Sequence, residues 1–225
     1  MKKPLANNGD GASDLSSHDR ILQSARTLFA GTGYENTTTS QIARTAGTSE
    51  SQLIKHFGSK EGLLEAIFEQ AWQRLAPAVR PLLEASPTPF DKLVALTDLM
   101  FQALESDQEM RTLLLLEGRR IRRHGHLVVL TRGFTQMVAV IDAILREMSG
   151  AGQLREDLHP EAVRSALIGA FEGLLRDRLL ADRVDYPARY DRDEMRRVFR
   201  AVLAGFLPGP PLPSADSRPP VAREA

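Results

Sequence analysis

The side chains of this sequence that are best suited to chemistry are polar, and they gather between residues 49 and 60. Gln52 carries an amide that can pair with adenine through two hydrogen bonds, and Lys55 carries an ammonium that can reach a guanine or a phosphate. Glu50 leaves two interpretations open: its carboxylate accepts from a cytosine amine, or it faces solvent and stabilises the first turn of its own helix. These residue types indicate contacts with the edges and backbone of a nucleic acid.

Two short helices, joined at a glycine, are needed to hold these side chains in place. Thr38 and Gln41 have the spacing of a capping box, in which the hydroxyl accepts from an amide of the first turn and the glutamine reaches back. Ser49 and Gln52 repeat that spacing at the start of the second helix, and Gly47 marks the bend between the two. The pattern predicts a helix-turn-helix, although spacing alone also fits a plain helical hairpin.

A helix-turn-helix cannot bury its own apolar side chains, so a preceding helix has to cover them. We expect that helix over residues 19–32, with Ser17 as its N-cap and with Leu28 and Phe29 turned toward the pair. The residues of the pair that are predicted to face this small core are Ile42, Ala43, Ala46, Leu53 and Phe57. The second short helix, closed by Gly58, then presents its polar face to a major groove.

A longer run of residues makes this prediction specific. The run consists of Gly33-Tyr34-Glu35, Thr37-Thr38, Ile42-Ala43, Ala46-Gly47, Ser49, Leu53, His56-Phe57-Gly58-Ser59-Lys60-Glu61 and Leu63-Leu64. It resembles the N-terminal signature of the TetR family of transcriptional regulators, and the resemblance extends from Ile21 to about Phe68. It implies an all-α fold of about nine helices. An N-terminal three-helix DNA-binding domain with the helix-turn-helix would precede a larger helical domain for ligand binding and dimerisation.

The resemblance also implies roles for single residues. Thr38 lies at a helix N-terminus, where amides favour a phosphate, and His56 and Lys60 match positions that hold the DNA backbone. Two positions depart from the family: Ile54 replaces a tyrosine, which removes a polar contact, and Gly62 replaces a glutamate or alanine, which weakens the start of the fourth helix. The residues predicted to contact DNA are Thr38, Ser49, Glu50, Ser51, Gln52, Ile54, Lys55, His56 and Lys60.

The composition of the whole chain excludes several classes of protein. It has no cysteine, so no disulfide framework, thiolate metal site or cysteine nucleophile is expected. Lys and Arg number 29 and Asp and Glu number 29, so net charge gives no indication of nucleic-acid binding and the DNA prediction depends on the local pattern. No apolar segment is long enough for a signal peptide or a membrane span, which favours a cytoplasmic protein without a membrane partner.

The order of segments predicts two domains between polar ends. We expect a disordered arm over residues 1–17, the DNA-binding domain over 18–64, a helical effector-binding and dimerisation domain over 65–207, and a disordered proline-rich tail over 208–225. The fourth helix, capped by Ser59, is predicted to run until Pro77. Further helices are predicted at 89–105, 108–122, 126–148, 160–181 and 191–206.

Large apolar side chains of the second domain can form an ordinary core or line a pocket for a small-molecule effector. Glu172 is either a polar group of that pocket or a surface residue. The predicted pocket residues are Phe68, Trp72, Met100, Phe101, Phe134, Met137, Phe171 and Glu172. Their composition favours a largely apolar effector, and no cofactor is expected.

The strongest run of positive charge extends from Arg119 to Arg123. It either forms a solvated helix end that complements the helix dipole, or it has a functional role, in which it binds an anionic ligand or couples the regulatory domain to the DNA-binding domain. A metal site built from Glu117, His124 and His126 lacks further ligands at suitable spacing, so no metal is expected.

The last two helices have wide apolar faces. These faces either cover the core of one protomer or meet their copies in a symmetric four-helix bundle, and the family resemblance favours the bundle. The residues predicted to dimerise are Val163, Leu167, Phe171, Leu174, Leu175, Phe199, Val202, Leu203 and Phe206. A homodimer would place two reading helices about one DNA turn apart, roughly 34–36 Å.

The function expected from the sequence is a regulator of transcription that binds a double-stranded operator and is released by the effector. The sequence contains no nucleophile–base pair, phosphate-binding glycine loop or metal-ligand set, so an enzyme is not predicted, and a helical enzyme remains a remote alternative. The main alternative is a helix-turn-helix protein that is regulated by a partner or by nothing, and it would lack a ligand cavity.

Overall fold

The computed structural model describes residues 15–117 and 131–209, and every contact below lies within these ranges. This part of the chain contains nine α-helices and no strand, so the all-α fold class predicted from the sequence is confirmed. The helices are α1 (Ser17–Thr32), α2 (Thr39–Thr45), α3 (Glu50–Phe57), α4 (Lys60–Ala85), α5 (Pro89–Ser106), α6 (Gln108–Glu117), α7 (Arg132–Gly150), α8 (Pro160–Arg183) and α9 (Arg192–Ala204).

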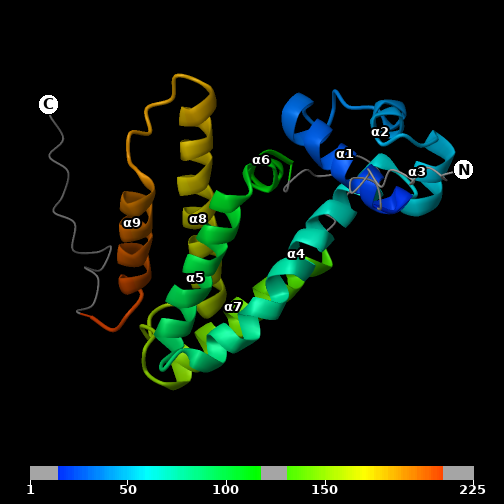
Figure 1. Cartoon of the computed structure of the whole chain (residues 1–225). Coiled ribbons are helices and arrows are strands. Elements are labelled where there is room, and N and C mark those ends of the chain that lie inside the picture. Colours follow the sequence, from blue (N-terminus) through cyan, green and yellow to red (C-terminus); the bar gives the residue numbers. More distant parts are fainter. Residues whose placement is uncertain (1–14, 118–130, 210–225) are drawn as a thin grey trace, which may run out of the picture.

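The helices form two groups that are joined by α4 (Figure 1). The N-terminal unit consists of α1, α2 and α3, and the body consists of α5, α7, α8 and α9 standing side by side. The long helix α4 runs from the N-terminal unit along α5 and α7, while α6 lies between α1 and α8. The body therefore contacts the N-terminal unit in two places, through α4 and through α6.

Helix α1 begins two residues earlier than the sequence predicts, and its N-cap is Ser16 and not Ser17. The Ser16 hydroxyl accepts from the Asp19 amide at 3.1 Å and donates to the Asp19 carboxylate at 2.7 Å. This hydrogen bond from Ser16, with a smaller contribution from His18, holds the pKa of the Asp19 carboxyl below its ordinary value. Ser17 is displaced into the first turn, where its hydroxyl lies 3.4 Å from Nε2 of His56.

Helix α4 continues past the point where the sequence predicts its end. Pro77 and Pro81 both lie inside it, and the helix ends only at Ala85. A proline removes one amide donor and leaves a carbonyl of the preceding turn without its partner. Both prolines are exposed, so water can satisfy the freed carbonyls, and packing of α4 against α5 and α7 keeps the helix continuous.

The predicted end of the helix at 108–122 and the predicted start of the helix at 126–148 fall outside the described residues. Residues 118–122 and 126–130 lie outside the described residues, as do the Arg119–Arg123 run and the candidate ligands His124 and His126. Within the described residues α7 is capped by Thr131, whose hydroxyl accepts from the Phe134 amide at 3.2 Å. No group of three metal-ligating side chains occurs in residues 15–117 and 131–209.

Apolar burial joins the N-terminal unit to the body without a break. Phe29, Ile42 and Leu53 are almost fully buried in the unit, and Phe101 and Leu145 are buried in the body. Burial of side chains of this size is the dominant favourable term in folding. Among the helices described here, none is both long enough and apolar enough to cross a bilayer.

Helices α4 and α7 approach each other closely at Gly133. A Cβ atom at this position would lie 2.6 Å from Cβ and 2.7 Å from Cγ of Trp72, closer than real contacts allow. Gly133 is buried and permits the indole of Trp72 to lie directly against the α7 backbone. The small residue therefore fixes the position of Trp72, which the sequence assigned to a pocket.

Candidate functional site

The helix-turn-helix is built from α2 and α3, and local capping sets its geometry. The Thr38 hydroxyl accepts from the Gln41 amide at 3.2 Å, and the Gln41 side chain accepts from the Thr38 amide at 2.8 Å, as the predicted capping box requires. Gly47 has a φ of +63°, a conformation that costs little without a side chain, and it turns the chain between the helices. The Thr48 amide then donates to the Ala43 carbonyl at 3.0 Å and closes the bend.

The second predicted capping box forms only by half. Ser49 accepts from the Gln52 amide at 3.2 Å, as expected, but the Gln52 side chain does not return to the amide of Ser49. Its amide oxygen instead accepts a hydrogen bond from the Thr48 hydroxyl. This contact holds the Gln52 side chain on the outside of the turn.

One face of α3 is polar and exposed. Leu53 is fully buried, whereas its neighbour Ile54 is 44% exposed. The exposed residues of the helix are Glu50, Ser51, Gln52, Ile54, Lys55 and His56, and Thr38 and Ser49 at the two N-caps are also exposed. All the residues predicted to contact DNA on α3 therefore lie on the side of the helix that is turned away from the core.

The Glu50 carboxylate is engaged within the N-terminal unit. It accepts a hydrogen bond from the hydroxyl of Thr39, which lies in the first turn of α2. The contact joins the starts of the two helices and fixes the angle between them. It adds a structural role to the two interpretations that the sequence left open for Glu50, and it does not exclude either.

Lys60 is also engaged inside the protein. Its ammonium donates to the carbonyl oxygens of Tyr34 at 3.0 Å and Thr37 at 3.1 Å, and it lies 4.3 Å from the centre of the Tyr34 ring. These contacts hold the turn between α1 and α2 against the start of α4. Two of the three ammonium protons are used in this way, which leaves one for a phosphate. Lys60 thus positions the N-terminus of α2, a role that the sequence did not suggest.

His56 belongs to a small aromatic group at the end of α3. Its ring packs edge-on against His18 at 5.7 Å between ring centres, and His18 stacks on Phe57 at 4.8 Å. The first turn of α1 therefore supports the last turn of α3. His56 keeps an exposed edge, consistent with a contact to a phosphate from this position.

Gly62 has a packing reason that the sequence did not indicate. A Cβ atom at residue 62 would lie 2.1 Å from the carbonyl oxygen of Phe57. The glycine therefore permits the tight connection between α3 and α4. The alanine or glutamate that is more usual in the family has a Cβ atom, which would clash with the backbone at this position of this chain. The predicted weakening of the helix start is offset by Ser59, whose hydroxyl accepts from the Gly62 amide at 3.0 Å.

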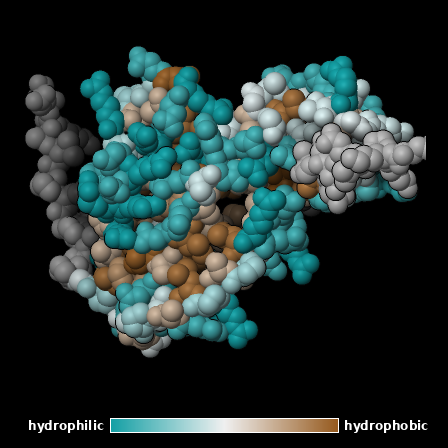
Figure 2. Space-filling view, in the orientation of Figure 1, coloured by the Kyte–Doolittle hydropathy of each residue, from teal (hydrophilic) through white to brown (hydrophobic). Residues whose placement is uncertain are grey.

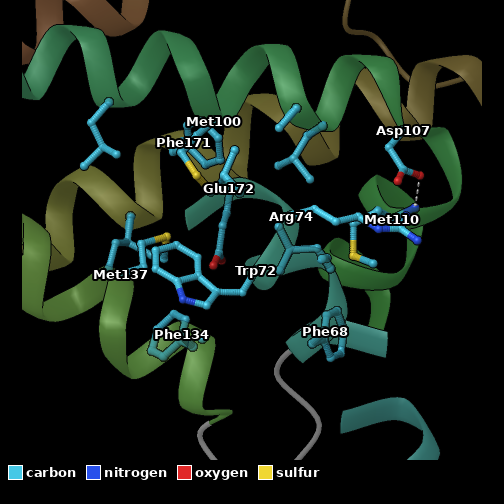
Figure 3. Close-up of a pocket in the computed structure, with 18 of the residues that line it drawn as sticks. Phe68, Trp72, Arg74, Met100, Asp107, Met110, Phe134, Met137, Phe171 and Glu172 are labelled. Atoms are coloured by element: carbon cyan, nitrogen blue, oxygen red, sulfur yellow. Dashed lines mark hydrogen bonds between the residues drawn. The ribbon is translucent and has the colours of Figure 1, made fainter. Parts of the chain in front are cut away.

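A cavity of about 680 Å³ lies between α4, α5, α7 and α8 (Figure 3). Figure 2 shows apolar side chains gathered around a hollow between α4 and the body. Seven of the eight residues that the sequence predicted for a pocket line this cavity: Phe68, Trp72, Met100, Phe134, Met137, Phe171 and Glu172. The eighth, Phe101, does not. It is fully buried behind the wall and packs against the rings of Phe171 at 4.5 Å and Phe199 at 5.5 Å.

The cavity reaches the contact between the N-terminal unit and the body. Arg26 of α1 forms an ion pair with Asp107 and lies 2.9 Å from a Glu109 oxygen, and Arg26 and Asp107 both line the cavity. Asp107 also accepts from the Met110 amide at 2.9 Å, at the start of α6. We call Arg26, Asp107 and Glu109 the α1–α6 joint. Sequence reasoning missed it because 81 positions separate Arg26 from Asp107, and no local pattern pairs them.

Five of the nine residues predicted to dimerise are buried within one protomer. Val163, Leu167, Leu175, Phe199 and Leu203 are at most 4% exposed within one protomer. Phe171 lines the cavity, and Leu174, Val202 and Phe206 are half-buried against the core. The apolar faces of α8 and α9 therefore cover the core of the protomer, which is the other interpretation that the sequence allowed. The five buried side chains offer almost no surface to a second copy, whereas Leu174, Val202 and Phe206 remain partly exposed.

The similarity of the chain to known proteins agrees with this arrangement. Residues 21–67 match the sequence profile described as "Bacterial regulatory proteins, tetR family". The transcriptional repressor KstR2 of Mycolicibacterium smegmatis is 31% identical over 149 residues, which cover 66% of this chain and 72% of that protein. The fatty acid metabolism regulator protein of Bacillus subtilis is 22% identical over 155 residues, covering 68% and 78% of the two chains.

The same fold occurs in a solved structure. The crystal structure of the transcriptional regulator FadR from Bacillus subtilis in complex with stearoyl-CoA superposes with a TM-score of 0.69. The match covers 84% of this chain and 97% of that chain at 20% identity, a level at which the likeness concerns the fold. Together with the exposed face of α3 and the extended similarity to KstR2, these findings show that the chain belongs to the TetR family and is a DNA-binding transcriptional regulator.

Proposed function

We propose that the protein is a homodimeric repressor that binds a double-stranded DNA operator and leaves it when a small, largely apolar effector fills the cavity. The observation that carries the proposal is the α1–α6 joint, because it brings the wall of the cavity into direct contact with the unit that presents α3. A sensor requires such a connection between its ligand site and its reading surface. A cytoplasmic location follows from a DNA partner.

Helix α3 enters the major groove in this proposal. Gln52 and Lys55 are exposed on it and carry the groups that recognise adenine and guanine edges. Thr38 at the N-terminus of α2 and His56 at the end of α3 lie where they can hold phosphates on either side of the groove. Lys60 supports them from beneath by fixing the turn before α2.

The lining of the cavity supports an apolar effector. Apolar side chains make up most of the wall, and they include aromatic rings and methionines from α4, α5, α7 and α8 that are seen in Figure 3. A volume of about 680 Å³ lies within the range of small-molecule sites, which span about 300–1,000 Å³. The similar regulator FadR was crystallised with stearoyl-CoA, a molecule with a long apolar chain.

An effector changes DNA affinity only if it binds one arrangement of the N-terminal units better than the other. The joint offers the necessary difference, since a ligand that moves Asp107 or Arg26 also moves α1 relative to α6. Rotation of α1 carries α2 and α3 with it, because the three helices share one core. The separation of two reading helices in a dimer would change accordingly.

The dimer needs more exposed surface than the residues predicted to dimerise offer. The outward side of α8 is exposed and bears small residues at Ala162, Ala166 and Gly169, and Val198 of the neighbouring helix α9 is 42% exposed. Small residues permit two helices to approach closely in a four-helix bundle. We assign the contact between protomers to this outward side of α8 and α9.

The proposal is tested by footprinting the purified protein on genomic fragments, followed by titration of the operator found there. Compounds are then screened for those that raise the melting temperature and lower operator affinity. A palindromic footprint released by an apolar compound is the expected result. A footprint that no compound affects would favour the alternative, a partner-regulated or ligand-independent DNA-binding protein, and absence of a specific footprint would contradict both.

A further inference from the structure

The two ends of the cavity differ in chemistry (Figure 3). At one end Trp72, Phe134, Met137 and Phe171 surround the carboxylate-bearing Glu172. At the other end lie Arg74, Met110 and the Arg26–Asp107 ion pair. A ligand that fits this cavity must therefore present an apolar body to the aromatic end and a polar or charged group to the other end.

Arg74 is the side chain that the protein leaves without compensation at this second end. It lines the cavity and is exposed, so it lies where the cavity meets solvent. Within residues 15–117 and 131–209 no hydrogen bond or ion pair to its guanidinium is found. Arg80, which is further along the same helix α4, differs in this respect, because its guanidinium pairs with the Glu84 carboxylate at 2.8 Å.

The neighbouring charges do not replace a partner for Arg74. Asp107 is already engaged by Arg26 and by the Met110 amide, so its negative charge is largely neutralised. An occupant that covers Arg74 removes it from water, and a guanidinium without a counter-charge is costly to desolvate. A carboxylate or phosphate on the occupant offsets this cost through paired hydrogen bonds of the kind that arginine makes.

We infer that the effector is an amphipathic anion, whose acidic group binds at Arg74 beside the α1–α6 joint and whose apolar body extends between Trp72 and Phe171. This inference rests on the effector-binding role proposed above and narrows the chemical class of the effector. Its orientation follows from the position of Arg74, which draws the acidic group to the end of the cavity beside the joint and leaves the aromatic end to the apolar body. Arg74 selects the acidic group, and the aromatic end selects the chain.

The position of the acidic group gives it access to the joint. Arg26 lies on the same stretch of wall, and its present partners Asp107 and Glu109 are both carboxylates. An anion held by Arg74 competes with them for the Arg26 guanidinium. The ligand group that provides affinity is then also the group that loosens α1 from α6, which links the class of effector to the release of DNA.

Three ligands with the same ten-carbon chain test the inference: decanoate, decanol and decyltrimethylammonium, each below its micelle concentration. Their dissociation constants are measured by calorimetry on the full-length protein and on the variants Arg74→Ala and Arg80→Ala. Arg80 is the matched control, since it is exposed on the same helix and lies outside the cavity. Decanoate should bind best, and Arg74→Ala should weaken it at least about tenfold while decanol is unaffected. Arg80→Ala should change none of the three.

Equal binding of decanoate and decanol, preference for the ammonium, failure of all three ligands to bind, or unchanged decanoate binding in Arg74→Ala would each overturn the inference. None of these results would contradict the proposed function as an effector-controlled repressor, because release of the operator by an effector of different chemistry is measured separately. A melting scan of Arg74→Ala without ligand shows whether the variant remains folded. Binding of decanol to it gives a second check on the integrity of the cavity.

Discussion

At the level of single residues, the polar groups of the DNA-facing surface are held in place by one another. Gln52 accepts from Thr48, Glu50 accepts from Thr39, and the Lys60 ammonium spans two carbonyls. Each contact limits the rotamers of a side chain before DNA arrives, which lowers the entropy lost on binding. In the complex with DNA, each of these hydrogen bonds is either kept or replaced by a hydrogen bond to DNA. The reading surface is therefore partly preorganised.

Ile54 is the apolar member of this surface, and its 44% exposure suggests a specific use. An apolar side chain in the major groove distinguishes thymine by contact with its 5-methyl group. We expect Ile54→Ala to weaken operator binding by about 1–3 kcal/mol at one position of each half-site. Competition binding with operators in which single thymines are replaced by uracil measures this directly.

Comparing the loss of affinity caused by uracil in the natural protein and in Ile54→Ala identifies the thymine methyl that Ile54 contacts. At the position concerned, uracil should weaken binding of the natural protein but have no further effect on Ile54→Ala. Ser51→Ala, on the same exposed face, serves as the control that keeps sensitivity to the methyl group. Additive losses from Ile54→Ala and uracil at every position would show that the side chain does not read the methyl.

The single residues also show what a sequence can and cannot predict. The exposed set on α3 was predictable because Leu53 and the caps at Thr38 and Ser49 fix the orientation of a short helix locally. The carbonyl contacts of Lys60 and the role of Gly62 were not predictable. Both depend on the distance between the start of α4 and other segments, which the sequence pattern does not contain. Of the pocket set only Phe101 was misplaced, because periodicity identifies an inward face without distinguishing wall from interior.

At the level of helices, most capped starts were predictable, whereas the end of α4 was not. A helix start depends on a hydroxyl or carboxylate three residues before the amide it accepts from, as at Thr88 and Asp191. The continuation of α4 through Pro77 depends on contacts with α5 and α7, which a local pattern does not contain. The same limit applies to the apolar faces of α8 and α9, which the pattern identified correctly but which pack largely on the protomer's own core.

The close contact of α4 and α7 at Gly133 leads to a prediction about the cavity. Gly133→Ala places a methyl group against Cβ and Cγ of Trp72, near the rigid base of the side chain. The overpacking should lower the free energy of unfolding by about 1–3 kcal/mol and displace the indole. Urea unfolding measures the first effect, and the shift of emission from the single tryptophan reports the second.

Gly31→Ala in α1 provides the comparison for that experiment, because no atom lies within 4 Å of a Cβ at residue 31. It should leave stability unchanged or raise it, since alanine favours a helix by up to about 1 kcal/mol over glycine. If Gly133→Ala behaved in the same way as Gly31→Ala, the close approach of α4 and α7 would be wrong.

The outward side of α8 leads to a second prediction at this level. Ala166→Glu adds a charge to the surface that we assign to dimerisation, and two such charges would face each other across a symmetric contact. We expect the variant to be a folded monomer that binds operator weakly, as measured by analytical ultracentrifugation and anisotropy. Ala139→Glu, at an exposed site on α7, should remain dimeric. If Ala166→Glu remained dimeric as well as Ala139→Glu, this face of α8 would be excluded as the contact between protomers.

For the molecule as a whole, the α1–α6 joint is the contact through which binding of the effector changes the affinity for DNA. Arg26→Gln keeps the size of the side chain but removes the charge that pairs with Asp107 and Glu109. Because the effector acts by loosening this contact, the variant should bind operator more weakly even without effector, and the ratio of operator affinities with and without effector should fall toward one. Anisotropy titrations of operator at zero and saturating effector measure that ratio.

Lys92→Gln is the control for this experiment, since it removes an ion pair to Glu147 between two helices of the body. It should retain the full response. An Arg26→Gln protein that is released from DNA as completely as the natural protein would show that the signal travels by another route, for which α4 is the remaining direct connection.

Helix α8 has two sides with different neighbours. Leu167, Phe171 and Glu172 form part of the cavity wall, whereas Ala166 and Gly169 of the same turns face outward. If the outward side pairs two protomers, the strength of pairing and the affinity for effector share one helix, and thermodynamic reciprocity requires each to alter the other equally. Diluting the protein would then change its apparent sensitivity to the effector, so that the abundance of the regulator itself sets the threshold at which its genes respond.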